Sequence, residues 1–136
     1  MEEIKLPVHI SGLWKPVYAK NPLETGSLGI GLVLRPLTRI LIRDARENCD
    51  VMINDTCVKM AHVETAKRIY GFSSSLRIYQ KIPLGAGAGV SANISIGLGY
   101  SVARVFFEDP VKRIILAGLI GHELEVLHRT GLGDVI

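Results

Sequence analysis

Alternation of apolar and polar residues predicts most of the extended structure in this chain. The clearest case is residues 76–82, where Leu76, Ile78 and Ile82 share one face and the charged or hydroxylated residues between them share the other. An Asn54-Asp55 pair, a strong turn signal, separates two shorter apolar runs and predicts a hairpin. We expect strands at residues 4–10, 28–34, 38–43, 51–53, 56–58 and 76–82.

Helical spacing of apolar residues predicts three helices, at residues 61–71, 91–107 and 111 to about 127. Gly71 is a typical stop for the first helix, and Pro110 suits the first turn of the last, where a missing N–H is harmless. The order of elements predicts one α+β domain, with a mixed or antiparallel sheet and the helices packed on one side. Hydrophobic residues make up 48% of the 136 positions, which is enough to build a core.

A glycine-rich segment joins the last predicted strand to the second predicted helix. It reads Pro-Leu-Gly-Ala-Gly-Ala-Gly-Val-Ser-Ala-Asn over residues 83–93. Free backbone N–H groups and the positive end of a helix converge at such a turn, which favours phosphate binding. A glycine-rich turn without any ligand is the alternative at this point.

Two common phosphate-binding motifs do not fit this segment. A P-loop needs a lysine after its glycines, and the chain has no lysine between Lys81 and Lys112. Gly87, Gly89 and Ala92 match the dinucleotide pattern, and Glu108 falls about where its ribose-binding acid would be. That acid ends a second strand, however, whereas the region around Glu108 is predicted to join two helices.

The pattern Pro-x-x-x-Gly-x-Gly-x-Ser-Ala, which runs from Pro83 to Ala92, resembles the second motif of the GHMP kinase superfamily. Residues 6–14 (LPVHISGLW) and 24–31 (ETGSLGIG) are similar to the opening of its archaeal pantoate kinase branch. The two glutamates of residues 123–125 and the TGLGD at 130–134 resemble a later signature of that branch. The three motifs occur in family order and span nearly the whole chain.

This resemblance implies that residues 1–136 form the N-terminal, ATP-binding domain of a GHMP kinase, related in fold to the second domain of ribosomal protein S5. It implies ATP and Mg²⁺ as cofactors and transfer of the γ-phosphate to a hydroxyl of pantoate or a similar small hydroxy acid, in coenzyme A biosynthesis. The positions that match the ATP-binding motif are Pro83, Gly85, Ala86, Gly87, Ala88, Gly89, Val90, Ser91 and Ala92.

The metal would need a hydroxyl and a carboxylate beside the glycines. Ser91 can present its hydroxyl to phosphate or magnesium, or act as a plain N-cap; we expect Ser95 to be a packing residue. Glu123 and Glu125 lie on different faces of a helix, so only one can point toward the glycine segment. The family spacing favours Glu125 as the magnesium ligand and leaves Glu123 as a solvent-facing alternative.

On the acceptor side, Asp134 matches the family's catalytic base; its alternative is an ordinary loop aspartate. His9 and Ser27 match the N-terminal signature and are candidate substrate-binding residues. Arg129 is the candidate partner of the acceptor carboxylate, or a surface arginine. The remaining histidines show no pairing typical of a metal site, so we interpret His62, His122 and His128 as structural or solvated.

The family's enzymes are about twice as long as this chain and have a second domain. We therefore expect catalysis to need a C-terminal half that is absent here. The chain would then be a truncated protein, one half of a split enzyme with a second-half chain as partner, or a relic without catalysis. Exposed apolar surface would favour such a partner or a homo-oligomer. The alternative functions are a GHMP kinase with another acceptor and a non-catalytic nucleotide-binding or interaction module.

Composition limits the other partners. The net charge of +3 and isoelectric point near 9.0 suit an anionic ligand, but no basic run supports nucleic-acid binding, and we expect none. No signal peptide is predicted after Met1, and no apolar stretch is long enough to cross a bilayer, so we expect a cytoplasmic protein without a membrane partner. In that setting Cys49 and Cys57 are predicted to be reduced thiols.

Overall fold

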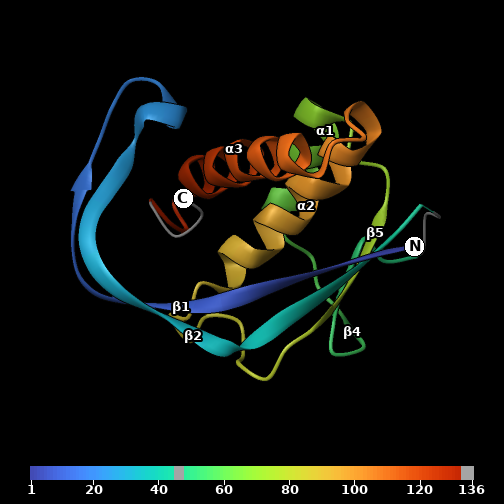
Figure 1. The fold of residues 1–136 in the computed structure, drawn as a ribbon, viewed down its shortest axis with the longest axis horizontal. Helices are drawn as coiled ribbons and strands as arrows, with labels where there is room; N and C mark the ends of the chain where they lie inside the picture. Colours follow the sequence, from blue (N-terminus) through green and yellow to red (C-terminus); the bar gives the residue numbers. More distant parts are fainter. Residues whose placement is uncertain (45–47, 133–136) are drawn as a thin grey trace.

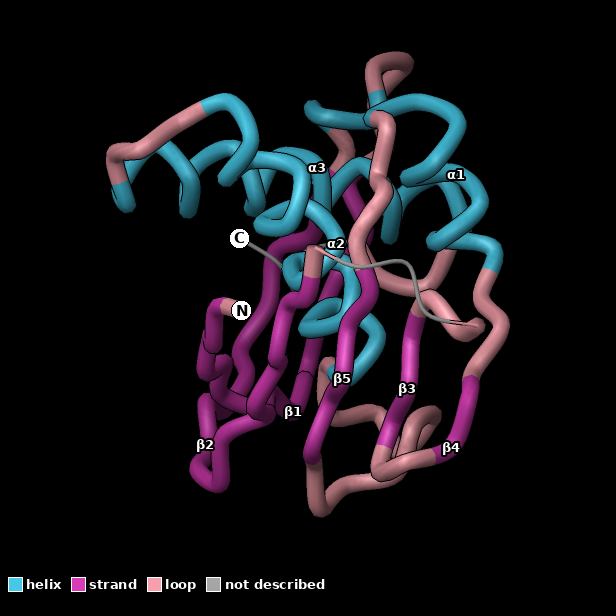
Figure 2. The backbone as a smooth tube through the Cα atoms, turned by 90° about the vertical axis from the view of Figure 1, so that its right-hand side faces the viewer, coloured by secondary structure: helices cyan, strands magenta, loops and turns pink. Residues whose placement is uncertain are grey.

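In a computed structural model, which describes residues 1–44 and 48–132, the chain folds into a twisted sheet that is covered on one face by three α-helices (Figures 1 and 2). Within these residues the sheet has five strands in the order β1-β2-β5-β3-β4. Its pairs are antiparallel except for β3 with β5, which are parallel. The elements are β1 (Glu2–Val17), η1 (Pro22–Glu24), β2 (Gly26–Arg43), β3 (Val51–Ile53), β4 (Thr56–Cys57), α1 (Ala61–Tyr70), β5 (Ser75–Tyr79), α2 (Val90–Phe106) and α3 (Pro110–His128). The predicted α+β class with a mixed sheet and helices on one side is confirmed.

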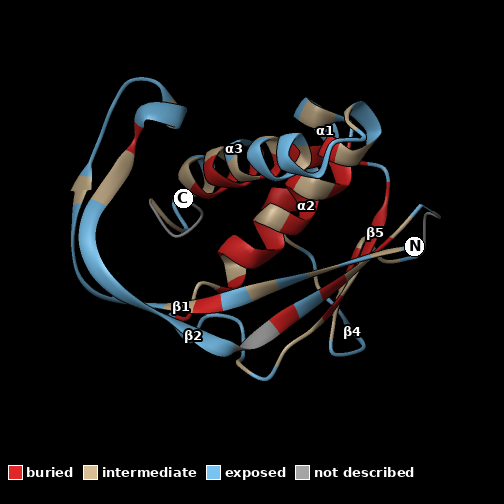
Figure 3. Ribbon diagram, viewed as in Figure 1, coloured by how far each residue is buried: buried red, intermediate tan, exposed pale blue. Residues whose placement is uncertain are grey.

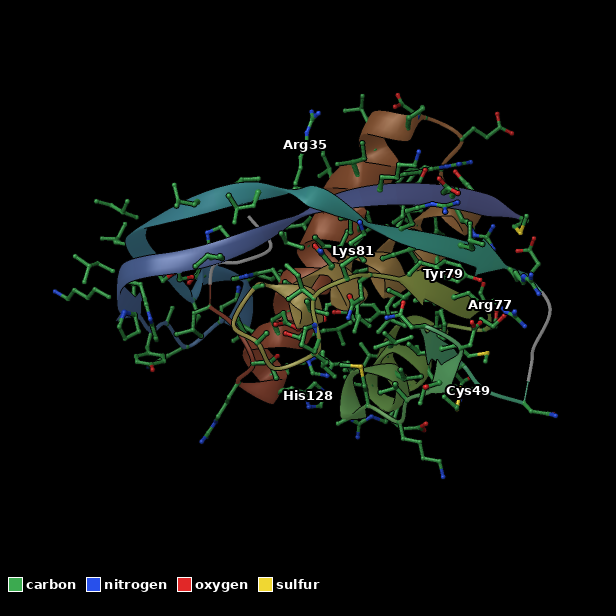
Figure 4. All side chains as sticks on the ribbon, turned by 90° about the horizontal axis from the view of Figure 1, so that it is seen from below. Arg35, Cys49, Arg77, Tyr79, Lys81 and His128 are labelled. Atoms are coloured by element: carbon green, nitrogen blue, oxygen red, sulfur yellow. A yellow bond between two sulfur atoms is a disulfide. The ribbon has the colours of Figure 1, made fainter. Side chains whose placement is uncertain are left out.

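The core lies between the sheet and α2, the helix closest to it. The alternation predicted for two strands is confirmed, because Ile40, Ile42, Leu76 and Ile78 all point inward and are buried. α2 is buried along most of its length, since the sheet lies on one side of it and α3 on the other (Figure 3). The uncovered face of the sheet carries charged and polar side chains, among them Arg77 and Tyr79 of β5 (Figure 4).

Glycines let α2 and α3 pack closely. A Cβ atom on Gly99 of α2 would lie 2.6 Å from the backbone oxygen of Ala117 in α3. A Cβ atom on Gly121 of α3 would lie 3.1 Å from the backbone nitrogen of Ile96 in α2. This close approach brings the C-terminal half of α3 against the first turns of α2.

The first two strands are much longer than predicted. β2 runs without a break through the two predicted strands 28–34 and 38–43, and β1 extends to Val17. The β1–β2 register shifts between Leu6 and Val8 and again between Ser11 and Leu13, so local irregularities replace the break that was predicted between residues 34 and 38. The C-terminal part of β1 and the N-terminal part of β2, which pair with each other, form an arched two-stranded arm. This arm leaves the sheet and curves back toward the end of α3 (Figure 1). Its apolar residues Leu13, Leu28, Ile30 and Val33 are exposed.

The predicted limits of the other elements need only small corrections. Asn54 and Asp55 have positive φ angles of 45° and 65° and form the expected hairpin turn. Gly71 ends α1 in a left-handed conformation, and Asp109 caps α3 directly before Pro110. Residues 107–109 join α2 to α3 without a strand, which removes the context that a dinucleotide-binding acid would need. β5 ends at Tyr79, three residues earlier than predicted.

The prediction of two reduced thiols is contradicted by the structure. Cys49 and Cys57 form a disulfide, with their Cα atoms 5.9 Å apart. Cys49 lies two residues before β3, and Cys57 lies in β4, which pairs with β3. The hairpin therefore brings together two cysteines that were predicted to be reduced because a cytoplasmic setting was expected. Among the described residues, no helix is long and apolar enough to cross a membrane.

Candidate active site

A cleft of about 1200 Å³ opens between the arm, the glycine-rich loop and the end of α3. Lys20 and Arg129 line it, and among its described lining residues there is no carboxylate, so its wall is electropositive and suits an anionic ligand. The principal residues around it are Ser11, Trp14, Tyr18 and Ser27 from the arm, Gly85, Gly87, Ala88 and Gly89 from the loop, Val90 and Ser91 from α2, and Arg129, Thr130 and Leu132 after α3.

The glycine-rich loop has left-handed backbone at every second residue. The φ angles of Gly85, Gly87 and Gly89 are 85°, 73° and 67°, values that L residues rarely adopt. Alternation of this kind can turn successive backbone N–H groups toward one side and form an anion-binding concavity. The backbone oxygen of Ala88 accepts a hydrogen bond of 3.1 Å from the N–H of His9, which fixes the loop to β1.

The N-terminus of α2 is open to the cleft. Gly89 is the N-cap and no side chain caps the helix, so its first N–H groups keep their capacity to bind an anion. Of the nine residues predicted to bind the cofactor, six line the cleft; Pro83, Ala86 and Ala92 do not, and Ala92 is buried in the core. Six of the nine positions therefore lie where they could contact an anion in the cleft.

Ser91 and Glu125 meet directly behind this loop. The Ser91 hydroxyl donates a hydrogen bond of 2.8 Å to Oε2 of Glu125, which lies one turn before the end of α3. Ser91 is inside the first turn of α2 and makes no cap, so the plain N-cap alternative is wrong. Ser95 is more than a packing residue, because its hydroxyl donates to Oε1 of Glu125 at 2.6 Å.

Glu125 is a buried carboxylate that remains ionised. Only 1% of its surface is exposed, and burial alone would raise its pKa. Hydrogen bonds from His62, Ser95 and Ser91, together with the charge interaction with His62, outweigh burial and lower the pKa below its usual value. An ionised carboxylate next to a hydroxyl at the edge of the cleft is an oxygen donor set of the kind that Mg²⁺ prefers.

Glu123 lies elsewhere, as its spacing from Glu125 predicted. Its carboxylate accepts a hydrogen bond from the hydroxyl of Tyr70 on α1, so it is paired with the protein rather than turned to solvent. Among the described residues, no group of three or more histidines, cysteines or acids could hold a metal. A magnesium ion at Ser91 and Glu125 would therefore take its other ligands from water and phosphate.

The predicted acceptor-side residues are only partly brought together. Ser27 and Arg129 line the cleft, and His9 lies outside its lining, with its ring over the backbone of Gly31. Asp134 lies outside the described residues.

Two of the histidines interpreted as structural or solvated are buried and bonded within the protein. His122 is buried, and its Nε2 lies 2.7 Å from the backbone oxygen of Thr25, next to the Gly26-Ser27 signature. His62 is also buried, lines the cleft and contacts Glu125 at 3.2 Å. Sequence analysis missed His62 and Ser95 because nothing local marks them as partners of Glu125. The one signal for Ser95 was its position, about one helical turn after Ser91.

Comparison with known proteins gives a consistent set of relatives. No family model matches the chain. Pantoate kinases of Thermococcus kodakarensis and Methanocaldococcus jannaschii are 29% and 28% identical to it, each over 96% of this chain and 46% and 47% of their own lengths. The pantoate kinase of Methanospirillum hungatei is 25% identical over 95% of this chain and 47% of its own length.

A solved structure described as a phosphotransferase related to the coenzyme A biosynthesis pathway superposes with a TM-score of 0.74 and 28% identity. It covers 98% of this chain, and the match spans 48% of the solved chain. The chain thus spans about half the length of the relatives it matches. Its sequence is similar to the N-terminal half of pantoate kinases, and its fold is similar to about half of this phosphotransferase.

Proposed function

We propose that this chain is the N-terminal, ATP-binding part of a GHMP-type kinase that transfers the γ-phosphate of ATP to a hydroxyl of pantoate or a similar small hydroxy acid. The single observation that carries the proposal is the hydrogen bond between Ser91 and Glu125 at the end of a left-handed glycine loop. The similarity to pantoate kinases supports the choice of acceptor. The mixed sheet with helices on one face supports the finer assignment to the fold of the second domain of ribosomal protein S5.

Each residue of the site has a part in this proposal. The backbone from Gly85 to Val90 binds phosphate oxygens, and the open N-terminus of α2 adds a favourable dipole. Ser91 and Glu125 hold Mg²⁺, which when bound would neutralise charge on the phosphates. This role requires the Ser91 hydroxyl to turn its proton away from Glu125.

The acceptor occupies the other end of the cleft in this proposal. Arg129 binds its carboxylate, since a guanidinium matches two carboxylate oxygens, and Ser27 orients its polar groups. His9, the other candidate for this side, lies outside the lining of the cleft and supports the glycine loop from β1 through its backbone contact with Ala88. Asp134 accepts the proton of the attacking hydroxyl, which makes that oxygen a better nucleophile.

A second candidate function is a nucleotide-binding or interaction module that acts only with a partner. The exposed apolar residues of the arm favour this candidate, because apolar surface of this kind is typical of contacts with another protein. The partner would be a separate second-half chain or a further copy of this chain. The two candidates share the nucleotide site and differ in whether phosphate is transferred.

Calorimetric titration with a non-hydrolysable ATP analogue, with and without Mg²⁺, tests the site. We expect Glu125→Gln and Ser91→Ala to lose most of the affinity that Mg²⁺ adds. Glu123→Gln is the matched control, since it lies on the same helix two residues away and faces Tyr70. Equal losses in Glu123→Gln and Glu125→Gln would contradict the assignment of the metal ligand.

An assay of phosphate transfer to pantoate then separates the two functions. It is run on the chain alone and with an added C-terminal half from a pantoate kinase. Transfer that appears with the added half supports the kinase. Nucleotide binding without transfer in either mixture supports the interaction module.

A further inference from the structure

His62 is the one buried side chain on α1 that faces the cleft and also contacts the candidate metal ligand. It lies in the first turn of the helix and is 4% exposed. Its Nε2 is 3.2 Å from Oε1 of Glu125 and 2.9 Å from Oγ1 of Thr130. Because an ionised carboxylate can only accept hydrogen bonds, the proton of this contact is on Nε2. His62 therefore joins α1 to both the end of α3 and the segment that follows it.

The two oxygens of Glu125 have different surroundings. Oε1 accepts from Ser95 at 2.6 Å and from His62, and both of these side chains are buried. Oε2 accepts only from Ser91 among the contacts of the described residues, and Ser91 lines the cleft. Oε1 is thus held between two buried side chains, whereas Oε2 lies behind Ser91, the residue that separates it from the cleft.

We propose that His62 is a positioning residue that fixes Oε1 of Glu125, so that Oε2 and the Ser91 hydroxyl form the pair that binds the metal. This inference rests on the proposed function and adds a residue to its site. A bound metal then contacts Glu125 through one oxygen. Partners that orient a ligand in this way are as much a part of a metal site as the ligand itself.

The surroundings of His62 suit this role. Its ring packs against that of His128, with the centroids 4.6 Å apart, and Nε2 of His128 lies 2.8 Å from the hydroxyl of Thr65. Burial, the charge of His62 and that of Arg68 lower the pKa of His128, although Glu125 opposes them, so this tilted ring is neutral at pH 7. A neutral neighbour adds no charge that would compete with Glu125 for the His62 N–H.

His62 also contacts Thr130, which lies in the segment that leads to the proposed acceptor end of the cleft. The backbone N–H of Thr130 donates to the backbone oxygen of Glu125 at 3.0 Å, and residues 129–132 line the cleft. His62 thereby couples the carboxylate to the segment that leads into Asp134 along the sequence. Loss of His62 is expected to loosen Glu125 first, because the backbone contact of Thr130 remains.

Binding of Mn²⁺, measured by electron paramagnetic resonance with a saturating ATP analogue, tests the proposal on the whole chain. His62→Leu removes the donor, and His62→Gln places an amide nitrogen near the position of Nε2. His128→Gln is the matched control, because it changes the neighbouring histidine without touching Glu125. We expect His62→Leu to weaken Mn²⁺ binding by about 10- to 100-fold, the usual effect of losing such a partner. His62→Gln should recover most of that loss, and His128→Gln should bind like the wild type.

The affinity for the analogue without metal should stay unchanged in every variant, because the glycine loop is intact. Wild-type Mn²⁺ affinity in His62→Leu would overturn the inference and leave the proposed function standing. Equal weakening in the leucine and glutamine variants would also overturn it, since the role would then be packing. No Mn²⁺ binding by the wild type would remove the proposed function as well. If His62→Leu does not fold, His62→Asn replaces it, because its amide is too short to reach Oε1.

Discussion

A single methyl group in the glycine loop should weaken nucleotide binding without unfolding the protein. Gly87 has a φ of 73°, and a Cβ atom placed on it would meet no atom within 4 Å. Gly87→Ala therefore adds no clash, and its cost is that of a left-handed L residue, about 1–2 kcal/mol. Gly87 lies between β5 and α2, outside any helix or strand, so we expect the backbone to relax there in the free protein and the cost to fall on the bound conformation. It corresponds to a loss of affinity of about 5- to 30-fold.

Gly71 provides a matched control for this substitution. Its φ is 70°, and a Cβ atom on it would likewise meet no atom within 4 Å, but it lies at the end of α1 opposite His62. Its N–H is held by the backbone oxygens of Ala66 and Lys67, so the helix end fixes its conformation. Gly71→Ala should therefore lower the free energy of unfolding by about 1 kcal/mol and leave nucleotide affinity unchanged.

Calorimetric titration with an ATP analogue and thermal unfolding of both variants separate the two effects. We expect Gly87→Ala to lose nucleotide affinity but keep its stability, and Gly71→Ala to lose stability but keep its nucleotide affinity. Wild-type affinity in Gly87→Ala would refute the view that the left-handed conformation is needed for phosphate binding. A similar loss of affinity in Gly71→Ala would show that the loop responds to general destabilisation.

Three further predictions concern the framework around the site. Stability should fall on acidification, because the folded-state pKa values of His128 and Glu125 are lowered and the unfolded chain therefore binds more protons. The loss should begin below about pH 6.5 for His128 and below about pH 4.5 for Glu125, and urea unfolding at pH 7, 5.5 and 4 measures it. Gly99→Ala should cost about 1–3 kcal/mol in urea unfolding, because its Cβ would lie 2.6 Å from a backbone oxygen of α3, and a cost near zero would contradict this close packing. Reduction of the disulfide between β3 and β4 should cost about 2–3 kcal/mol, measured as a lower unfolding midpoint with reductant, and two free thiols in the untreated protein would contradict the disulfide.

Local patterns in the sequence were sufficient to predict most of the elements and the segment that forms one wall of the cleft. The strand 76–82, the glycine segment and the helix after it follow from alternation, glycine spacing and apolar periodicity. Ser91 was placed correctly because its position at a helix start follows from those local limits. Glu125 was preferred to Glu123 through a resemblance, and the helical geometry required that only one of them reach the loop.

Features that depend on long-range contacts were not predictable in this way. The arm forms because β1 and β2 pair along nearly their whole length, apart from two register shifts, and no window of either strand reveals this pairing. The disulfide depends on where the β3–β4 hairpin places Cys49 relative to Cys57. His62 gained its role from α1 packing against the end of α3, and α1 alone has an ordinary amphipathic pattern.

The distance between Ser91 and Glu125 is ultimately set by the packing of two helices. Ser91 and Ser95 lie on α2, and Glu125 lies on α3 about one turn after Gly121. A Cβ atom on Gly121 would lie 3.2 Å from the backbone carbonyl carbon of Ser95, so this glycine permits the approach that brings a carboxylate within hydrogen-bonding distance of two serines. The small residues of α3 thus serve the site as well as the core. A substitution that separates these helices by a few tenths of an ångström would act on the Ser91–Glu125 pair without contacting either residue, so core packing and the geometry of the candidate site are not independent in this protein.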